Sequence, residues 1–200
     1  MSEQIQRTGH KKSWLRWPHR ERVTVGCLSC YNDGRLTYKH LDADQLEEAW
    51  ESGNMAAHVC DQPVTIYHNP EEWHIQDYDG DIGRVSQHLG ECPDIPNLIE
   101  CMRLFEDNAP VYVPAFLFAT EFVHGTPTAE QVESMAEQMT WTDDVEDYFR
   151  EQAYECGFIT DGDHLASYID WEHWARDQMY GYYSMEHGDY TYLIPHGVSI

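Results

Sequence analysis

The apolar residues near the start of the chain are grouped as in the strands of an antiparallel sheet. Val23 to Cys30 and Arg35 to Leu41 are two short runs in which Val, Leu and Thr recur. Between them, Tyr31-Asn32-Asp33-Gly34 supplies the residues that adopt positive φ angles in a tight hairpin. The pattern therefore predicts two strands joined by a short turn.

The segments that follow predict the remainder of this sheet and a short helix. Pro63 to His68 and Trp73 to Tyr78 have the composition of two further strands that return to the sheet. Asp42 or Asp44 is suited to cap a helix that runs through Glu51. We therefore expect an N-terminal antiparallel sheet accompanied by short helices.

Helical spacing dominates the rest of the chain. Leu98, Ile99, Met102 and Phe105 recur at intervals of one, three and three residues, which predicts a helix that ends before Pro110. Val111 to Ala119 is apolar throughout and fits either a buried strand or a helix. Three further helices are predicted to start at Thr128, at Thr142 or Asp143, and at Asp170. A closing strand is predicted to start at Tyr190.

These elements predict an α+β protein in which an N-terminal antiparallel sheet with short helices precedes a mainly helical C-terminal part. At 200 residues the chain has room for several small subdomains. The expected division is a basic arm (1–22), an N-terminal α/β subdomain (23–90), a central subdomain (91–140) and a C-terminal helical subdomain (141–200).

The charge of the chain is strongly negative and unevenly distributed. The 36 acidic and 12 basic residues give a formal net charge of -24, and six of the basic residues fall within residues 1–22. The hydrophobic share of 42% is nevertheless sufficient for a folded core. Such a charge repels nucleic acid and attracts basic surfaces, so we expect no nucleic acid as a partner.

The longest apolar stretches, such as Ala115 to Ala119, are much shorter than the roughly 20 residues of a membrane-spanning helix. The N-terminus also lacks the apolar block of a signal peptide. We therefore expect no membrane association, a location in the cytoplasm and reduced cysteines.

Cys27 and Cys30 form the single closely spaced cysteine pair of the sequence. Structural zinc sites need two more ligands with comparable local spacing, and the neighbouring sequence offers none. On a continuous strand the two side chains would point to opposite faces. Ordinary packing is therefore the favoured interpretation, with metal binding or redox chemistry as the alternative.

Other motifs give no support for catalysis or for a bound cofactor. Asp77 to Asp81 resembles the opening of a calcium loop, but Ile82 stands where Gly is needed and His88 where Glu is needed. His68 with Glu72 and His173 with Asp177 are pairs that the composition alone produces. No nucleophile elbow, phosphate loop or zinc-protease motif is present, so we expect no enzyme and no cofactor.

Carboxylates form regular rows on the predicted helices. Asp144, Asp147, Glu151 and Glu155 are spaced three, four and four residues apart, which places them on one helix face without basic partners at i,i+4. Ordinary solvated faces alternate in sign, whereas like charges at i,i+4 cost a few tenths of a kcal/mol per pair. The expected functional surface consists of this row with Glu130, Glu133, Glu137, Asp170 and Asp177. Further acidic surface is expected at Glu47, Glu48, Glu71, Glu72, Asp77, Asp79 and Asp81.

Three segments resemble the ArdA antirestriction proteins of plasmids, phages and transposons. They are Val23 to Leu36 (VTVGCLSCYNDGRL), Glu71 to Gly80 (EEWHIQDYDG) and Tyr168 to Asp177 (YIDWEHWARD). The resemblance covers the chain from Val23 to about Asp189.

This resemblance implies an elongated, three-subdomain homodimer without catalytic activity, encoded by a phage or plasmid. It also implies that the carboxylates mimic bent B-form DNA and block the DNA path through the specificity and methyltransferase subunits of type I restriction-modification enzymes. An acidic scaffold or regulatory protein acting on another DNA-binding or defence complex is the alternative. An undetected hydrolase is a further one.

Overall fold

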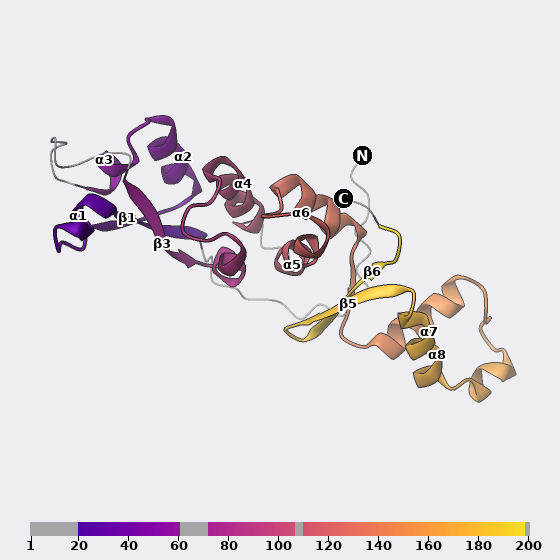
Figure 1. The fold of residues 1–200 in the computed structure, drawn as a ribbon. Coiled ribbons are helices and arrows are strands. Elements are labelled where there is room, and N and C mark those ends of the chain that lie inside the picture. Colours follow the sequence, from indigo (N-terminus) through magenta and orange to yellow (C-terminus); the bar gives the residue numbers. More distant parts are fainter. Residues whose placement is uncertain (1–19, 61–71, 107–109, 199–200) are drawn as a thin grey trace. The chain divides into compact units, whose positions relative to one another are not determined.

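The computed structural model describes residues 20–60, 72–106 and 110–198. The chain divides into two compact units, with the boundary between Glu133 and Ser134. Figure 1 shows the helices and strands of both. None of the helices in the described ranges has the length and apolar character needed to cross a membrane.

The first unit contains a three-stranded antiparallel sheet with the strand order β2-β1-β3. Val23 faces Leu41 on one side of the central strand, and Val25 faces Ile75 on the other. Both valines are fully buried. The sheet bounds are β1 (Arg22–Cys27), β2 (Tyr38–Leu41) and β3 (Trp73–Asp79).

The connection between β1 and β2 differs from the predicted tight hairpin. The first strand ends at Cys27, and the chain continues as a short helix, α1 (Leu28–Asn32), before Gly34 adopts a φ of 76°. The prediction that Cys27 and Cys30 point to opposite faces of a strand is therefore wrong. Because a helical turn follows the strand, both side chains are buried together.

Helices form the remainder of the first unit. Asp42 and Gln45 form a reciprocal capping box at the start of α2, which confirms the predicted helix start. The apolar segment that fitted either a strand or a helix is helical and largely buried, as α5. The helix bounds are α2 (Ala43–Glu51), α3 (Met55–Val59), η1 (Ile82–His88), α4 (Ile95–Glu106) and α5 (Tyr112–Phe122).

Helix α6 (Ala129–Gln138) crosses the boundary between the units. Thr128 and Gln131 make the predicted capping box. The Gln131 backbone N–H donates a 3.2 Å hydrogen bond to the Thr128 hydroxyl, and the Thr128 backbone N–H donates a 3.0 Å hydrogen bond to the side-chain oxygen of Gln131.

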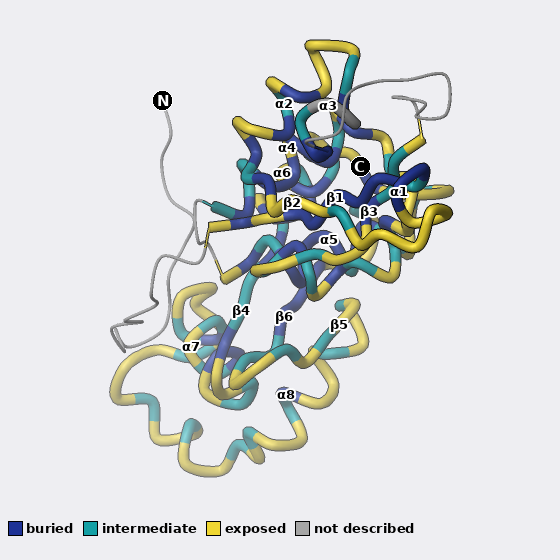
Figure 2. The backbone as a smooth tube through the Cα atoms, turned by 90° about the vertical axis from the view of Figure 1, so that its left-hand side faces the viewer, coloured by how far each residue is buried: buried dark blue, intermediate teal, exposed yellow. Residues whose placement is uncertain are grey.

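The second unit combines helices with a second three-stranded antiparallel sheet, in the order β4-β6-β5. Tyr148, Phe149, Ala175 and Leu193 form its core cluster. Figure 2 shows that much of the chain between α7 and α8 is exposed. The element bounds are β4 (Thr140–Thr142), α7 (Val145–Glu155), η2 (His164–Tyr168), α8 (Trp171–Met179), β5 (Tyr182–His187) and β6 (Tyr190–Pro195).

The predicted fold class is confirmed: the protein is α+β, with an N-terminal antiparallel sheet and short helices before a mostly helical part. The closing strand was predicted, but its sheet partners β4 and β5 were not. The predicted strand at residues 63–68 lies outside the described residues.

Candidate functional site

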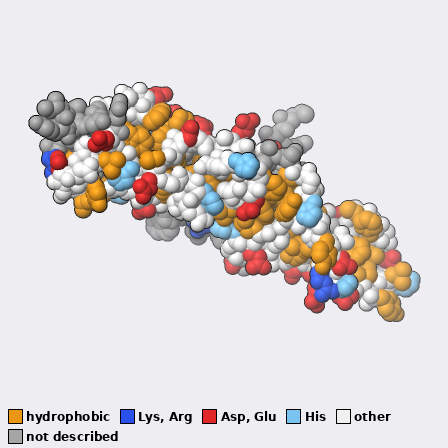
Figure 3. All heavy atoms as spheres, in the orientation of Figure 1, with side chains coloured by type: hydrophobic (Ala, Val, Ile, Leu, Met, Phe, Trp, Pro, Cys, Tyr) orange, Lys and Arg blue, Asp and Glu red, His pale blue; other side chains and the backbone are white. Residues whose placement is uncertain are grey.

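The carboxylates predicted on the three C-terminal helices all reach the surface. Side chains of Asp and Glu, in red in Figure 3, recur on the visible face over both units, whereas Lys and Arg, in blue, are few. The exposed residues of the predicted functional surface are Glu130, Glu133, Glu137, Asp144, Asp147, Glu151, Glu155, Asp170 and Asp177.

The α7 row consists of Asp144, Asp147, Glu151 and Glu155. Its first residue, Asp144, also has a structural role. Its side chain accepts a 3.0 Å hydrogen bond from the backbone N–H of Asp147 and so caps the helix. The Thr142 hydroxyl accepts a 3.0 Å hydrogen bond from the backbone N–H of Asp144, which fixes the entry to α7. The row therefore begins at a residue that two hydrogen bonds hold in place.

Arg150 modifies the expectation that the α7 row has no basic partners. Its guanidinium forms ion pairs with Asp147 and, at 3.7 Å, with Glu146. Within the described part of the chain, Glu151 and Glu155 form no ion pair, and Glu155 accepts a 3.0 Å hydrogen bond from the Gln152 amide. The distal half of the row thus carries the uncompensated charge.

Helix α8 packs beside α7 and contributes Asp170 and Asp177 to the predicted functional surface. Asp170 caps α8 by accepting a 3.0 Å hydrogen bond from the backbone N–H of His173. The ring of His173 lies 3.5 Å from a carboxylate oxygen of Asp177. The α7 and α8 carboxylates therefore belong to one packed helix pair.

Glu130 and Glu133 instead take part in an acidic depression of the first unit. This open hollow, of about 690 Å³, is lined by five carboxylates and one arginine. Its acidic side chains are Asp44, Glu100, Glu106, Glu130 and Glu133.

Arg103 lies at the centre of this cluster of carboxylates. It pairs with Glu47 at 2.5 Å, with Glu100 at 3.1 Å and with Asp44 at 3.3 Å. The hydrogen bond with Glu47 is the largest cause of a raised Arg103 pKa. Glu47, predicted as acidic surface, is therefore half-buried in an ion-pair network. No role for Arg103 was predicted from the sequence. The spacing of Glu100 and Arg103 at i,i+3 was the available signal.

The other predicted acidic residues occupy varied positions. Glu48, Glu72, Asp77 and Asp79 are exposed, while Asp81 is partly buried. The Glu72 carboxylate accepts a 2.9 Å hydrogen bond from the Ser29 hydroxyl, and Asp81 pairs with Arg84 at 3.4 Å. Glu71 lies outside the described residues.

A second hollow of the first unit is lined by aromatic rings. Trp50 and Trp73 meet edge to face, with ring centroids 6.4 Å apart, in a depression of about 740 Å³. Glu47, Glu51 and Glu100 also line it. An aromatic face beside carboxylates is suited to a cationic side chain.

The fold and these surfaces define an acidic α+β protein that carries carboxylates in rows and hollows on its surface. The model of the antirestriction protein (ArdA) family matches residues 23–192 of the chain. The chain therefore belongs to the ArdA family, a family of inhibitors, and its function is antirestriction. Restriction-modification enzymes are the targets that this membership implies. A search of curated proteins finds no match.

Proposed function

We propose that the protein mimics B-form DNA and occupies the DNA-binding groove of type I restriction-modification enzymes, at the specificity and methyltransferase subunits. Incoming phage or plasmid DNA is thereby protected. The observation that carries the proposal is that the nine carboxylates predicted as the functional surface, which lie on or cap α6, α7 and α8, are all exposed in a chain of net charge -24.

The spacing on α7 supports this proposal. At a rise of about 1.5 Å per residue, positions three or four apart lie roughly 4.5 to 6 Å apart along the helix axis. Phosphates along one strand of B-form DNA repeat every 3.4 Å or so along the axis, with sideways winding added. Asp147, Glu151 and Glu155 therefore approximate a short phosphate row.

The ion pairs that two arginines form within the chain help to explain how a protein of this charge stays folded, which supports the same proposal. Uncompensated like charges destabilise a compact state. Arg103 and Arg150 each join two or more carboxylates and so reduce this repulsion, while Glu151 and Glu155 stay available to a partner. The field outside the protein remains strongly negative.

The proposal includes action as a homodimer in the host cytoplasm. Two protomers are needed because the resemblance to ArdA proteins implies mimicry of a long stretch of DNA. Neither catalysis nor a nucleic-acid partner is part of it. Binding rests on a distributed field, so single contacts contribute little: exposed charge pairs are worth about 0.2 to 1 kcal/mol each.

The test measures inhibition of duplex binding by a type I enzyme. The single variants Asp147→Asn and Glu151→Gln should each weaken inhibition less than about tenfold, as a loss of about 1 kcal/mol implies. The quadruple variant, with Asp144→Asn and Glu155→Gln added, should weaken it far more. Asn at position 144 retains the helix cap. Asp33→Asn, on an exposed carboxylate that Arg35 already pairs at 2.8 Å, is the control.

Three outcomes contradict the proposal. Complete loss of inhibition from one exposed carboxylate would favour an enzyme with a specific catalytic group. Binding to the target that competing duplex fails to displace would favour an acidic scaffold or regulator. A quadruple variant that inhibits like the wild type would show that the α7 row is not part of the contact surface.

A further inference from the structure

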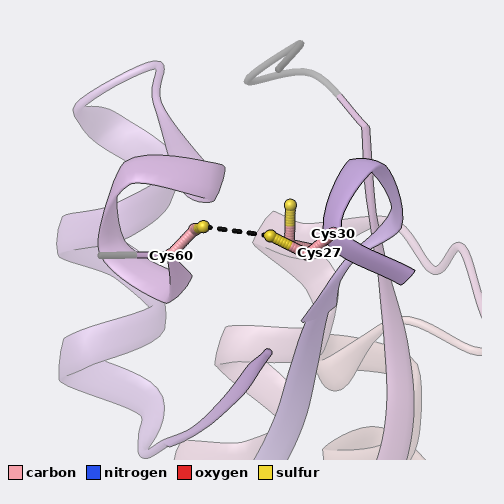
Figure 4. A group of neighbouring side chains, drawn as sticks. All are labelled: Cys27, Cys30 and Cys60. Atoms are coloured by element: carbon pink, nitrogen blue, oxygen red, sulfur yellow. Dashed lines mark hydrogen bonds between the residues drawn. The ribbon is translucent and has the colours of Figure 1, made fainter. Parts of the chain in front are cut away.

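Three buried cysteines from separate elements meet in the first unit. Cys27 is the last residue of β1, Cys30 lies in α1, and Cys60 directly follows α3. Their Sγ atoms all lie within 4.8 Å of one another, and those of Cys30 and Cys60 are 3.3 Å apart (Figure 4). None of the three side chains is more than 4% exposed.

We propose that Cys27, Cys30 and Cys60 bind one thiophilic metal ion, Zn²⁺, as three thiolates. With Zn–S bonds of about 2.3 Å, the sulfur atoms of a tetrahedral site are roughly 3.8 Å apart. The observed 3.3 Å and the limit of 4.8 Å bracket this separation. Small side-chain rotations therefore suffice to close the site around an ion.

The local backbone supports such a site. The Cys27 N–H donates a 3.1 Å hydrogen bond to the Thr37 carbonyl, and the Arg35 N–H donates a 2.9 Å bond to the Cys30 carbonyl. These backbone bonds hold the Cys-x-x-Cys turn in place.

Charge balance favours an ion over three ionised thiols. Three buried thiolates alone would be strongly disfavoured, whereas with Zn²⁺ the net charge of the site is -1. Each thiol releases one proton as its sulfur binds the metal, so three protons leave per ion. Among the described residues no fourth His, Cys, Asp or Glu completes the group. The fourth position is therefore available to a small exogenous ligand such as water.

Such an ion would join the consecutive elements β1 and α1 to α3, which lies farther along the chain. It would link the end of β1 and the start of α1 to the end of α3, 30 residues beyond Cys30. Because an unfolded chain does not hold this arrangement, metal binding should stabilise the fold.

The experiment measures the zinc content of the full chain after expression in zinc-supplemented medium. Mass spectrometry should detect about one zinc per chain, and each of Cys27→Ser, Cys30→Ser and Cys60→Ser should remove it. The matched controls should keep it: Cys101→Ser for a buried cysteine outside the group, and Cys92→Ser for an exposed one. Zinc retained by the variant with all three substitutions would overturn the proposal.

A second measurement does not depend on the folding of variants. The wild-type protein, stripped with a chelator and verified as folded by circular dichroism, is titrated with Co²⁺. Thiolate charge-transfer absorption saturating at one equivalent is the expected result. A folded protein that binds neither Co²⁺ nor Zn²⁺ would overturn the site. A mass of the native protein that is two hydrogen atoms lower, owing to a disulfide between Cys30 and Cys60, would also overturn the metal site. The two cysteines would then form a redox site.

Discussion

The carboxylate of Glu21 accepts a 2.8 Å hydrogen bond from the backbone N–H of Ile82. Its second oxygen accepts a 3.0 Å bond from the N–H of Asp81, so one side chain caps the start of η1. Glu21 is only 2% exposed, and burial is the largest cause of its raised pKa. It lies within residues 1–22, the range predicted to be an arm. It nevertheless joins the segment just before β1 to the loop after β3.

Glu21→Gln should therefore reduce the free energy of unfolding. An amide presents one oxygen, so one of the two N–H groups loses its acceptor, at a cost of about 1 to 3 kcal/mol. Denaturant unfolding of the variant and the wild type measures the difference. An equal stability of the two proteins at pH 5 would show that the lost hydrogen bond contributes nothing.

The same pair of proteins should show a defined pH dependence. A carboxyl whose pKa is raised in the folded state contributes stability that is fully present below its unfolded pKa of 4.5 and is lost as pH rises through the folded pKa. Gln does not titrate. The stability gap between wild type and Glu21→Gln should therefore narrow as pH rises above 4.5. A gap that widens over this range would contradict the assigned direction.

Arg103→Gln should destabilise the first unit by about 1 kcal/mol at low ionic strength, because Asp44, Glu47 and Glu100 then repel one another. The loss should shrink in high salt, where the repulsion is screened. Melting temperatures at two salt concentrations measure both effects. Arg35→Gln, which breaks a single exposed pair, is the control and should change little.

If the aromatic hollow receives a basic side chain of the target, Trp50→Ala should weaken target binding about tenfold, the effect of losing roughly 1.4 kcal/mol at an aromatic anchor. Tyr31→Ala, on a comparably exposed ring away from the hollow, should leave affinity unchanged. Equal effects of both substitutions would exclude a specific anchor at Trp50.

Removal of residues 1–19 should leave cooperative unfolding and melting temperature nearly unchanged, because the segment has no periodic apolar face to contribute to a core. Removal of residues 1–22 should be more harmful. It also deletes Glu21 and the 2.7 Å ion pair between Arg20 and Asp42. Thermal unfolding of both truncations tests the difference, and a large loss in the shorter one would contradict it.

Light scattering at micromolar concentration should give a mass of twice the 23.4 kDa chain. Exposed rings of the second unit, among them Phe158 (71% exposed) and Tyr168 (83% exposed), offer the kind of apolar side chain that anchors an interface. A monomeric mass would contradict the proposed homodimer.

Local chemistry was sufficient to predict the helix starts and several strands. Asp42, Thr128 and Asp170 cap helices because their short polar side chains reach the free N–H groups of the first turn, which depends only on neighbouring residues. The exposure of Glu151 and Glu155 follows likewise from helical spacing, since the opposite face of α7 is apolar.

What the sequence alone determined about this protein is therefore its acidic charge, its α+β class and the helix faces that carry carboxylates. Contacts between distant residues required the tertiary structure: Arg103 reaches Glu47, Glu21 reaches Ile82, and Cys60 reaches Cys30. These partners come from different elements, and no periodicity along the chain specifies which elements pack together. The packing of the helices of the first unit, η1 included, on its sheet and on one another decided them.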